Sequence, residues 1–229
     1  MAILLGIAAY LFCGIPTANL LAWVVKGKDL RGYGSHAVTA SNAGELMGKW
    51  ATALVGVVDI LKGAAPVWAA QALDQSLAVQ ISTGLFGIVG HNWSPFLGFQ
   101  GGRGLTIVIG VLMAAAPLEM LMFAIVAVFG VTFFRSVPMN LGFATALLPL
   151  WAVSLEEPPA IVWGTVAMVA MVFLKRLWGN RLQDMPTRDR AKVFWYRILY
   201  DRDTKDRRKW VHRQGPDPLQ GPDPLAPNP

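Results

Sequence analysis

Residues 90–104 read GHNWSPFLGFQGGRG and hold five glycines, a histidine and an arginine between two apolar runs. Glycine lets main-chain N–H groups approach a ligand closely, and an arginine adds a fixed positive charge. Such a combination suits the binding of an anion, above all a phosphate. Taken alone, the segment is more typical of a flexible connector between two hydrophobic helices. The choice between an anion site and a connector depends on the residues around it.

A second group of chemically capable residues lies in an earlier polar stretch. Residues 32–42 read GYGSHAVTASN and supply the hydroxyl groups of Ser35 and Ser41 and the amide of Asn42. These groups hydrogen-bond readily to substrates, but Ser and Asn also commonly cap helices. Ser41 or Asn42 is therefore also a candidate cap for a helix that begins near Glu45.

Two opposite charges lie inside an apolar run. Asp59 and Lys62 are three residues apart and share one face of a predicted helix. Charges at such depth are costly and usually point into a polar interior, so both are functional candidates. The alternative is a pair that only neutralises itself. If Lys62 faces the loop of residues 90–104, it adds a second cation beside Arg103, and two cations can hold two phosphates.

The elements that must position these residues are predicted to be membrane-spanning helices. The chain has 229 residues, of which 54% are hydrophobic and 15% charged, a composition typical of an integral membrane protein. Residues 2–25 carry no charge and are long enough to cross a hydrocarbon core of about 30 Å. Gly14 and Pro16 should kink this run. No basic segment precedes it, which argues against a cleaved signal peptide.

We predict an all-α, polytopic membrane fold of about seven transmembrane helices. The further apolar runs cover residues 50–73, 76–90, 105–118, 120–134, 136–155 and 158–174. With a turn at residues 117–119, no Lys or Arg is left on the outer side, so the N-terminus lies outside and the basic tail in the cytoplasm. A five-span alternative, with one long helix through Glu119 and a re-entrant piece after Arg135, gives the same orientation.

The C-terminal part has a different composition. Residues 175–213 carry thirteen Lys or Arg against five Asp, interleaved with aromatic residues. Residues 183–213 are predicted to form a basic cytoplasmic segment on anionic lipid, and the alternative is a solvated charged helix. Nucleic acid would also suit the charge, but the membrane tether makes it a poor candidate partner. Residues 214–229 contain the repeat QGPDPL twice and are predicted to be disordered.

Three motifs together resemble one family of bacterial membrane enzymes. They are GHNWSPFLGFQGGRG, DILKG at residues 59–63, and ASN at residues 40–42 after Gly34 and Ser35. Over residues 1–182 their order and spacing are similar to those of the acyl-phosphate:glycerol-3-phosphate acyltransferases of the PlsY type. The resemblance implies a small all-helical enzyme of the bacterial inner membrane whose motifs face the cytoplasm. It also implies transfer of a fatty acyl group from acyl phosphate to glycerol 3-phosphate, giving lysophosphatidic acid and phosphate without a metal or coenzyme A.

The resemblance also implies roles for particular residues. The catalytic candidates are Ser35, His91 and Asn42. The phosphate-binding candidates are Ser41, Lys62, Gly101, Gly102, Arg103 and Gly104. An acyl phosphate is an activated mixed anhydride, so the protein must mainly position two phosphorylated substrates and neutralise their charge. The implied partners are these substrates, membrane lipids and the enzyme that makes acyl phosphate. No cofactor is implied, and three scattered histidines and one cysteine form no credible metal cluster.

The sequence departs from the family pattern at several positions. The replacements are Glu45 for an arginine, Ala170 for a histidine, Phe173 for an asparagine, and Gln100 and Arg103 for lysines. His36 is a candidate substitute for one lost group, and Lys49 or Lys175 for the lost cation. An acyltransferase remains the favoured function. The alternatives are a catalytically silent relative that binds an acyl phosphate, a lipid or a partner protein, and a small transporter.

Overall fold

The protein is a bundle of α-helices. The structure, a computed structural model, describes residues 1–134, 136–178 and 189–206, and these ranges contain helices and loops but no β-strand. The α-helices are α1 (Ala2–Gly14), α2 (Thr17–Lys26), α3 (Ala40–Met47), α4 (Lys49–Ala72), α5 (Leu77–Asn92), α6 (Leu105–Ala115), α7 (Pro117–Phe134), α8 (Val137–Ser154), α9 (Pro159–Trp178) and α10 (Arg190–Tyr200). Two short 3₁₀ helices, η1 (Leu30–Gly32) and η2 (Pro95–Leu97), lie in loops. The predicted all-α class is confirmed.

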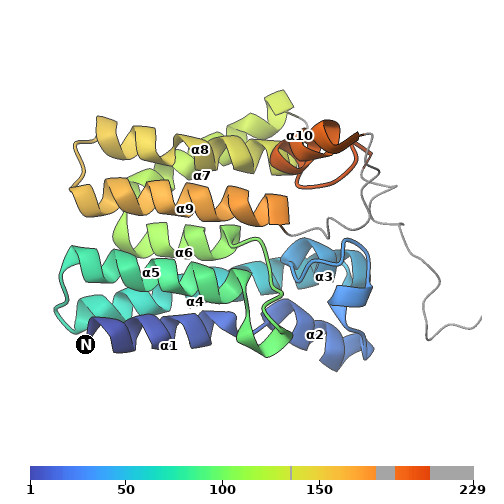
Figure 1. The fold of residues 1–229 in the computed structure, drawn as a ribbon, viewed down its shortest axis with the longest axis horizontal. Coiled ribbons are helices and arrows are strands. Elements are labelled where there is room, and N and C mark those ends of the chain that lie inside the picture. The colour runs from blue at the N-terminus through green and yellow to red at the C-terminus, as the bar shows by residue number, and fades with distance from the viewer. Residues whose placement is uncertain (135, 179–188, 207–229) are drawn as a thin grey trace, which may run out of the picture.

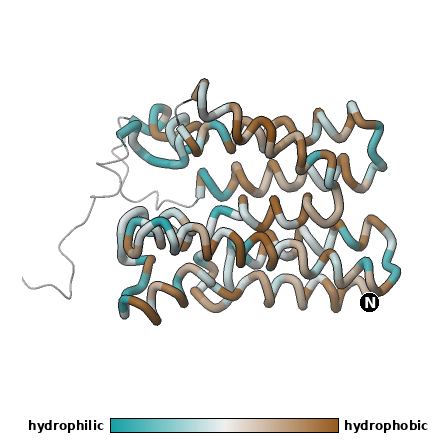
Figure 2. Tube along the Cα trace, turned by 180° about the vertical axis from the view of Figure 1, so that it is seen from behind, coloured by the Kyte–Doolittle hydropathy of each residue, from teal (hydrophilic) through white to brown (hydrophobic). Residues whose placement is uncertain are grey.

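The longer helices have the length and composition of membrane spans. Among the described residues, five segments are long and apolar enough to cross a membrane: residues 2–26, which include α1 and α2, and the helices α4, α7, α8 and α9. Helices α5 and α6 are shorter, with 16 and 11 residues. Large apolar side chains are exposed along the bundle, among them Ile3, Val24, Phe133 and Trp163. Figure 2 shows polar residues gathered at the two ends of the bundle. This surface suits lipid along its sides and water at its ends.

Helices that are distant in sequence lie side by side. Figure 1 shows α1 along α5, and α9 between the layer of α5 and α6 and the layer of α7 and α8. Helices α4 and α6 approach very closely, because a Cβ on Gly63 would meet the backbone of Ile107 and one on Gly110 would meet the carbonyl oxygen of Ile60. Small residues commonly permit such close packing between membrane helices.

The chain reverses between α6 and α7. Helix α6 ends at Ala115 and α7 begins at Pro117, so the break falls at Ala116, just before the turn predicted at residues 117–119. The five-span alternative requires one helix through Glu119, whereas α7 begins two residues before that position. The break at Ala116 therefore agrees with the division used in the seven-helix prediction.

The two ends of the bundle differ in charge. One end contains the α4–α5 turn with Asp74 and the α8–α9 turn with Glu156 and Glu157. The opposite end, called the site end below, consists of residues 27–39, residues 93–104 and α10. The basic side chains at this end include Lys28, Arg31 and Arg103 of the loops, Lys49 at the start of α4 and Lys175 near the end of α9. The basic loops thus share one end of the bundle, as the charge pattern of the sequence predicts.

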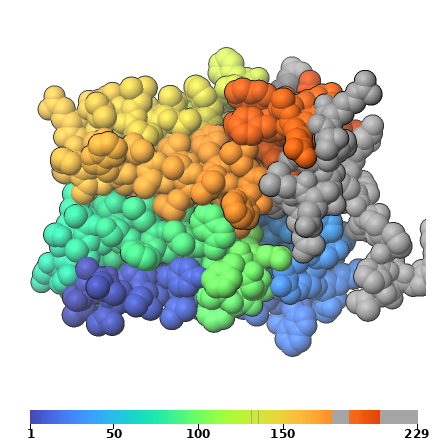
Figure 3. Space-filling view, viewed as in Figure 1, coloured from blue at the N-terminus to red at the C-terminus, as the bar shows by residue number. Residues whose placement is uncertain are grey.

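Helix α10 packs on α8 and α9 at the site end, as Figure 3 shows. Arg197 is 1% exposed and donates from Nη1 to the carbonyl oxygen of Leu177 (2.8 Å) and from Nε to Asp203 Oδ1 (2.6 Å). Arg176 of α9 donates to the carbonyl oxygen of Ile198 (2.8 Å). Two of these hydrogen bonds, from Arg197 to Leu177 and from Arg176 to Ile198, therefore fix this segment to the bundle, and the third lies within the segment.

The other face of α10 is exposed and aromatic. Phe194, Trp195 and Leu199 are all more than a third exposed. The described part of the basic segment, residues 189–206, is thus bound to the bundle by one face. Neither sequence interpretation, a lipid-surface segment or a solvated helix, includes this docking. The remaining tail, with the predicted disordered residues 214–229, lies outside the described residues.

Candidate active site

The loop of residues 93–104 has a defined fold at the site end. Ser94 is 1% exposed, its hydroxyl donates to the carbonyl oxygen of Gly14 (2.6 Å), and it forms an isolated antiparallel bridge with Gln100. The Phe99 N–H donates to the carbonyl oxygen of Ser94 (2.8 Å). These contacts tie the loop to the end of α1. The loop therefore has the fixed backbone that a binding site needs, in place of the flexible connector that its composition favours.

Three glycines of this loop are packed too tightly for a larger residue. A Cβ on Gly101 would meet the carbonyl oxygens of His91 and Asn92, and a Cβ on Gly102 would meet the imidazole ring of His91. Gly104 has a φ of +76°, which side chains rarely adopt, and it precedes the first residue of α6. The Gly102 N–H donates to the carbonyl oxygen of His91 (3.1 Å). The loop thus needs these glycines to pack on the end of α5.

A small pocket lies where this loop meets the break between α1 and α2. It is lined by residues 13–18, Val38, Asp59, His91, Ser94, Gly101 and Gly102. A carboxylate, an imidazole and the glycine backbone therefore share one wall. Sequence reasoning missed Ser94 and Thr17 as lining residues, although Ser94 stands within the loop motif and Thr17 follows the predicted kink. Within the described ranges, no three His, Cys, Asp or Glu side chains gather as metal ligands.

Asp59 and Lys62 form the ion pair that their spacing predicts. Lys62 Nζ lies 3.4 Å from Asp59 Oδ1, and both side chains are more than nine-tenths buried. The same Nζ donates to the carbonyl oxygen of Ile15 and to Thr17 Oγ1 (3.0 Å). Lys62 thus satisfies a carbonyl group at the α1–α2 break. This contact supports the structural interpretation of the pair, while the role of Lys62 as a phosphate contact stays a prediction.

Arg103 connects the loop of residues 93–104, called the glycine loop below, to the C-terminal half of the chain. Its Nη1 donates to the carbonyl oxygen of Lys175 (2.9 Å), and its Nε lies 3.2 Å from Asp201 Oδ2. Burial raises the pKa of the Asp201 carboxyl, although the positive charges of Arg103 and Arg176 act in the opposite direction. Lys175 is 4% exposed, and its Nζ lies 5.1 Å from the centre of the Trp93 ring, a cation–π arrangement.

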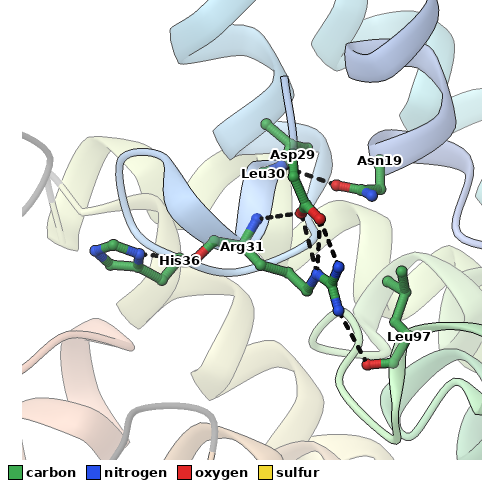
Figure 4. Close-up of polar contacts among 6 residues, drawn as sticks. All are labelled: Asn19, Asp29, Leu30, Arg31, His36 and Leu97. Carbon is green, nitrogen blue, oxygen red and sulfur yellow. Dashed lines mark hydrogen bonds and ion pairs between the residues drawn. The ribbon is translucent and has the colours of Figure 1, made fainter. Parts of the chain in front are cut away.

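Residues 27–39 are attached to the glycine loop through Arg31. Figure 4 shows Arg31 Nε donating to both carboxylate oxygens of Asp29 (3.1 and 3.0 Å) and Nη1 donating to the carbonyl oxygen of Leu97 (3.4 Å). This hydrogen-bonded pair lowers the pKa of Asp29 and raises that of Arg31. His36, the candidate substitute, is exposed, and its Nδ1 lies 2.9 Å from the carbonyl oxygen of Arg31.

Asn42 organises the backbone of residues 27–39. Its Nδ2 donates to the carbonyl oxygens of Leu30 (3.2 Å), Tyr33 (2.9 Å) and Ala37 (2.9 Å). Its Oδ1 accepts a hydrogen bond from the N–H of Ser35 (3.3 Å). The Asn42 amide therefore holds in place the segment that carries the Ser35 hydroxyl. A direct role of Asn42 in catalysis stays a prediction.

The N-cap of α3 is Thr39, so the predicted capping by Ser41 or Asn42 is wrong. Thr39 Oγ1 accepts a hydrogen bond from the N–H of Asn42 (3.3 Å), and α3 begins directly after Thr39. The sequence predicts one helix that begins near Glu45, whereas the structure has two helices there, α3 and α4. Gly48, with a φ of +99°, separates them. Ser41 is exposed in the first turn of α3.

The predicted site residues fall into two groups. Those that line the pocket are His91, Gly101 and Gly102. Those that lie outside its lining are Ser35, Ser41, Asn42, Lys62, Arg103 and Gly104. Val38 reaches the pocket from the same loop as Ser35. The structure therefore places the glycine loop and the histidine together, and it places Ser35 in the neighbouring loop and Ser41 in the first turn of α3.

The positions that depart from the family pattern lie in different surroundings. Glu45 and Ala170 are exposed, and Phe173 is half-buried. Of the two candidates for the lost cation, Lys49 is exposed at the start of α4, whereas Lys175 is buried beside the glycine loop. Of the two, Lys175 contacts the glycine loop, through its backbone carbonyl and Arg103, and its role as the substitute cation stays a prediction.

Relatives of known name match most of the chain. The family model for glycerol-3-phosphate acyltransferase matches residues 3–183. Glycerol-3-phosphate acyltransferase 5 of Dehalococcoides mccartyi is 34% identical over 218 residues, which cover 92% of this chain and 93% of the relative. The glycerol-3-phosphate acyltransferase of Geobacter sulfurreducens is 30% identical and is aligned over 83% of this chain and 98% of its own.

Solved structures agree with these matches. The glycerol 3-phosphate form of PlsY, an integral membrane glycerol 3-phosphate acyltransferase, is similar with a TM-score of 0.72 and 30% identity over 76% of this chain and 88% of its own. The lysophosphatidic acid form has a TM-score of 0.70 and 25% identity over 87% and 97% of the two chains. The chain is thus an integral membrane protein that belongs to the glycerol-3-phosphate acyltransferase family.

Proposed function

We propose that the chain transfers a fatty acyl group from acyl phosphate to glycerol 3-phosphate, giving lysophosphatidic acid and inorganic phosphate. Membership of the family supports this activity, as do the glycerol 3-phosphate and lysophosphatidic acid forms of the similar PlsY structure. The observation that carries the proposal is the folded glycine loop, which places Gly101 and Gly102 on a pocket wall with His91 and holds Arg103 beside it.

The reaction needs little covalent help from the protein. A hydroxyl oxygen of glycerol 3-phosphate attacks the acyl carbon, the bond between that carbon and the phosphate oxygen breaks, and the hydroxyl proton passes to a phosphate group. The acyl carbon is already activated, so positioning and charge stabilisation supply most of the rate enhancement. The positive charges at the site end serve this purpose in the proposal.

Eight of the nine predicted site residues have a place in this mechanism. Arg103 and the N–H groups of Gly101 and Gly104 bind the phosphate of glycerol 3-phosphate. His91, in the pocket wall, orients the attacking hydroxyl or carries its proton. The hydroxyl group of Ser35 contacts substrate from the neighbouring loop, which Asn42 holds in shape, and that of Ser41 does so from the first turn of α3. Lys62 fixes the α1–α2 break and adds positive charge behind the pocket.

Replacing Lys175 by methionine should raise the KM for the phosphorylated substrates by about tenfold, because a charge-assisted contact is lost. The substitution keeps the length of the side chain, and Arg103 still binds the unchanged backbone carbonyl of residue 175. Steady-state kinetics would measure the effect. Lys49→Met removes an exposed lysine and serves as the matched control. Equal kinetics for the two variants would contradict the assignment of Lys175.

The acyl chain is proposed to lie in an apolar groove along α1. The groove has a volume of about 230 Å³ and is lined by Leu5, Ala8, Ala9, Phe12, Ala65, Pro66, Ala69 and Thr83. Phe12 directly precedes the pocket residues Cys13 and Gly14. In this proposal the acyl chain runs from the phosphate at the site end along the apolar side chains of α1.

An Ala8→Phe substitution should fill part of this groove. We expect kcat/KM for palmitoyl phosphate to fall by about tenfold, since burial of a few methylene groups is lost, while octanoyl phosphate is affected less. The ratio of the two kcat/KM values is the measurement. Ala53→Phe, at an exposed position of α4 outside the groove, is the control, and an unchanged ratio in Ala8→Phe would exclude this path for the acyl chain.

We infer that the site end faces the cytoplasm of a bacterial inner membrane. Basic loops gather there while Asp74, Glu156 and Glu157 lie at the opposite end, as the positive-inside rule requires. The exposed aromatic face of α10 then lies at the lipid interface. Both substrates, and the enzyme that makes acyl phosphate, would reach the site from that side.

The proposed function is tested with purified protein in lipid nanodiscs. Supplied with palmitoyl phosphate and glycerol 3-phosphate, it should form lysophosphatidic acid, detected by mass spectrometry, and an equal amount of phosphate. Binding of glycerol 3-phosphate without any product would indicate a catalytically silent relative. Movement of a solute into liposomes without a covalent product would indicate a transporter.

A further inference from the structure

We infer that Asp201 is a positioning residue that holds Arg103 in the orientation needed to bind the phosphate of glycerol 3-phosphate. The inference rests on the proposed function, in which Arg103 is a substrate-binding residue. The stretch matched by the family model ends at residue 183. Helix α10 and Asp201 therefore form an addition to that stretch, and the addition contacts Arg103 of the glycine loop.

The guanidinium group of Arg103 is held from two sides. Its Nε lies 3.2 Å from Asp201 Oδ2, and its Nη1 donates to the carbonyl oxygen of Lys175 (2.9 Å). Because a guanidinium group is planar, contacts at two of its nitrogens fix the direction of the plane as well as its position. The Arg103 and Asp201 side chains are only 10% and 22% exposed, so solvent screens the pair less than it would screen a surface pair.

Asp201 is itself fixed by the segment that carries it. It follows α10 in a left-handed conformation (φ +54°), and its N–H donates to the carbonyl oxygen of Arg197 (3.0 Å). Arg197 is bound in turn to the carbonyl oxygen of Leu177, and Arg176 is bound to that of Ile198. Contacts at several points join α9 to this segment. These contacts fix the position of Asp201 relative to α9.

The carboxylate of Asp201 leaves the site positively charged. Arg103, Arg176 and Arg202 all act electrostatically on this carboxylate, and Lys175 lies beside Arg103. Asp203 adds a second negative charge near Asp201. The four basic side chains still outnumber the two carboxylates, so an incoming phosphate meets a net positive surface. This charge balance favours orientation of Arg103 by Asp201 over competition with the phosphate.

The test compares Asp201→Ala and Asp201→Asn in the full chain in nanodiscs. Asp201→Ala should raise the KM for glycerol 3-phosphate by about tenfold, since the charge-assisted contact that orients Arg103 is lost. Asp201→Asn retains an oxygen acceptor and should show a smaller increase. The KM for acyl phosphate should stay within about twofold of the wild-type value in both variants. Asp206→Asn, an exposed residue of the same segment, is the control and should leave both KM values unchanged.

A comparison in a variant of Arg103 separates a positioning role of Asp201 from a general loss of structure. Glutamine lacks the positive charge that Asp201 contacts in the wild type, so in Arg103→Gln the further change Asp201→Ala should have little additional effect on KM. If the two substitutions raised KM by independent factors that multiply, the inference would be overturned. A lowered Tm of the Asp201 variants with an unchanged KM would overturn it as well. A wild-type chain that makes no lysophosphatidic acid would refute the proposed function and this role with it. Unchanged KM values in active Asp201 variants would refute the role of Asp201 alone.

Discussion

Gly101→Ala is expected to lower kcat/KM by about a hundredfold, because a displacement of roughly 1 Å in a positioning element can cost that much. A methyl group at this position would meet the carbonyl oxygens of His91 and Asn92. Neither backbone group can move without shifting the end of α5, so the glycine loop must leave its place on the pocket wall. Steady-state kinetics with acyl phosphate and glycerol 3-phosphate measure the loss.

Gly32→Ala is the matched control for this substitution. A Cβ on Gly32 would meet no other atom within 4 Å, and its φ is not in the left-handed region. It also lies at the site end, in the loop that precedes α3. The control should retain wild-type kcat/KM, whereas wild-type kinetics in Gly101→Ala would show that the position of the glycine loop does not matter for turnover.

Arg103→Gln is expected to weaken the binding of glycerol 3-phosphate by about a hundredfold, because a hydrogen-bonded charge pair in a partly buried site is lost. Isothermal calorimetry in nanodiscs would measure the affinity directly. Arg190→Gln removes an exposed arginine at the start of α10 and is the control. It should leave the affinity unchanged.

The Arg103→Gln variant also removes a positive charge next to the partly buried Asp201. A disturbed C-terminal segment would also weaken binding, so the double variant Arg103→Gln/Asp201→Asn is needed to separate this effect from the loss of a phosphate contact. This double variant leaves no uncompensated carboxylate at the contact. Persistent weak binding supports the role of Arg103 at the phosphate, and recovery of wild-type affinity would rule it out.

Local patterns in the sequence predict the helices and several of their ends. Uncharged apolar runs indicate the membrane class, and Gly14 with Pro16 indicates the interruption between α1 and α2. The reversal between α6 and α7 lies at Ala116, next to the residues predicted to turn. The spacing of Asp59 and Lys62 predicts their ion pair. These features depend on residues close in sequence, which is why periodicity and composition are sufficient for them.

The remaining features of the site depend on contacts between distant segments. The sequence places Lys62 on a helix face but does not predict that its ammonium group binds the carbonyl oxygen of Ile15. Likewise, the charge of the tail suggests lipid or solvent, whereas α10 docks on the bundle and brings Asp201 to Arg103. Such contacts arise from the packing of helices, and no local pattern encodes them.

The most direct test of the account is the binding of glycerol 3-phosphate by the glycine loop. Affinity is measured by calorimetry in nanodiscs for the wild-type chain, Gly101→Ala and Gly32→Ala, with inorganic phosphate as competitor. We predict that the wild type and Gly32→Ala bind glycerol 3-phosphate, that phosphate competes, and that Gly101→Ala binds far more weakly. Equal affinity in all three proteins, or no competition by phosphate, would contradict the assignment of the phosphate site to this loop.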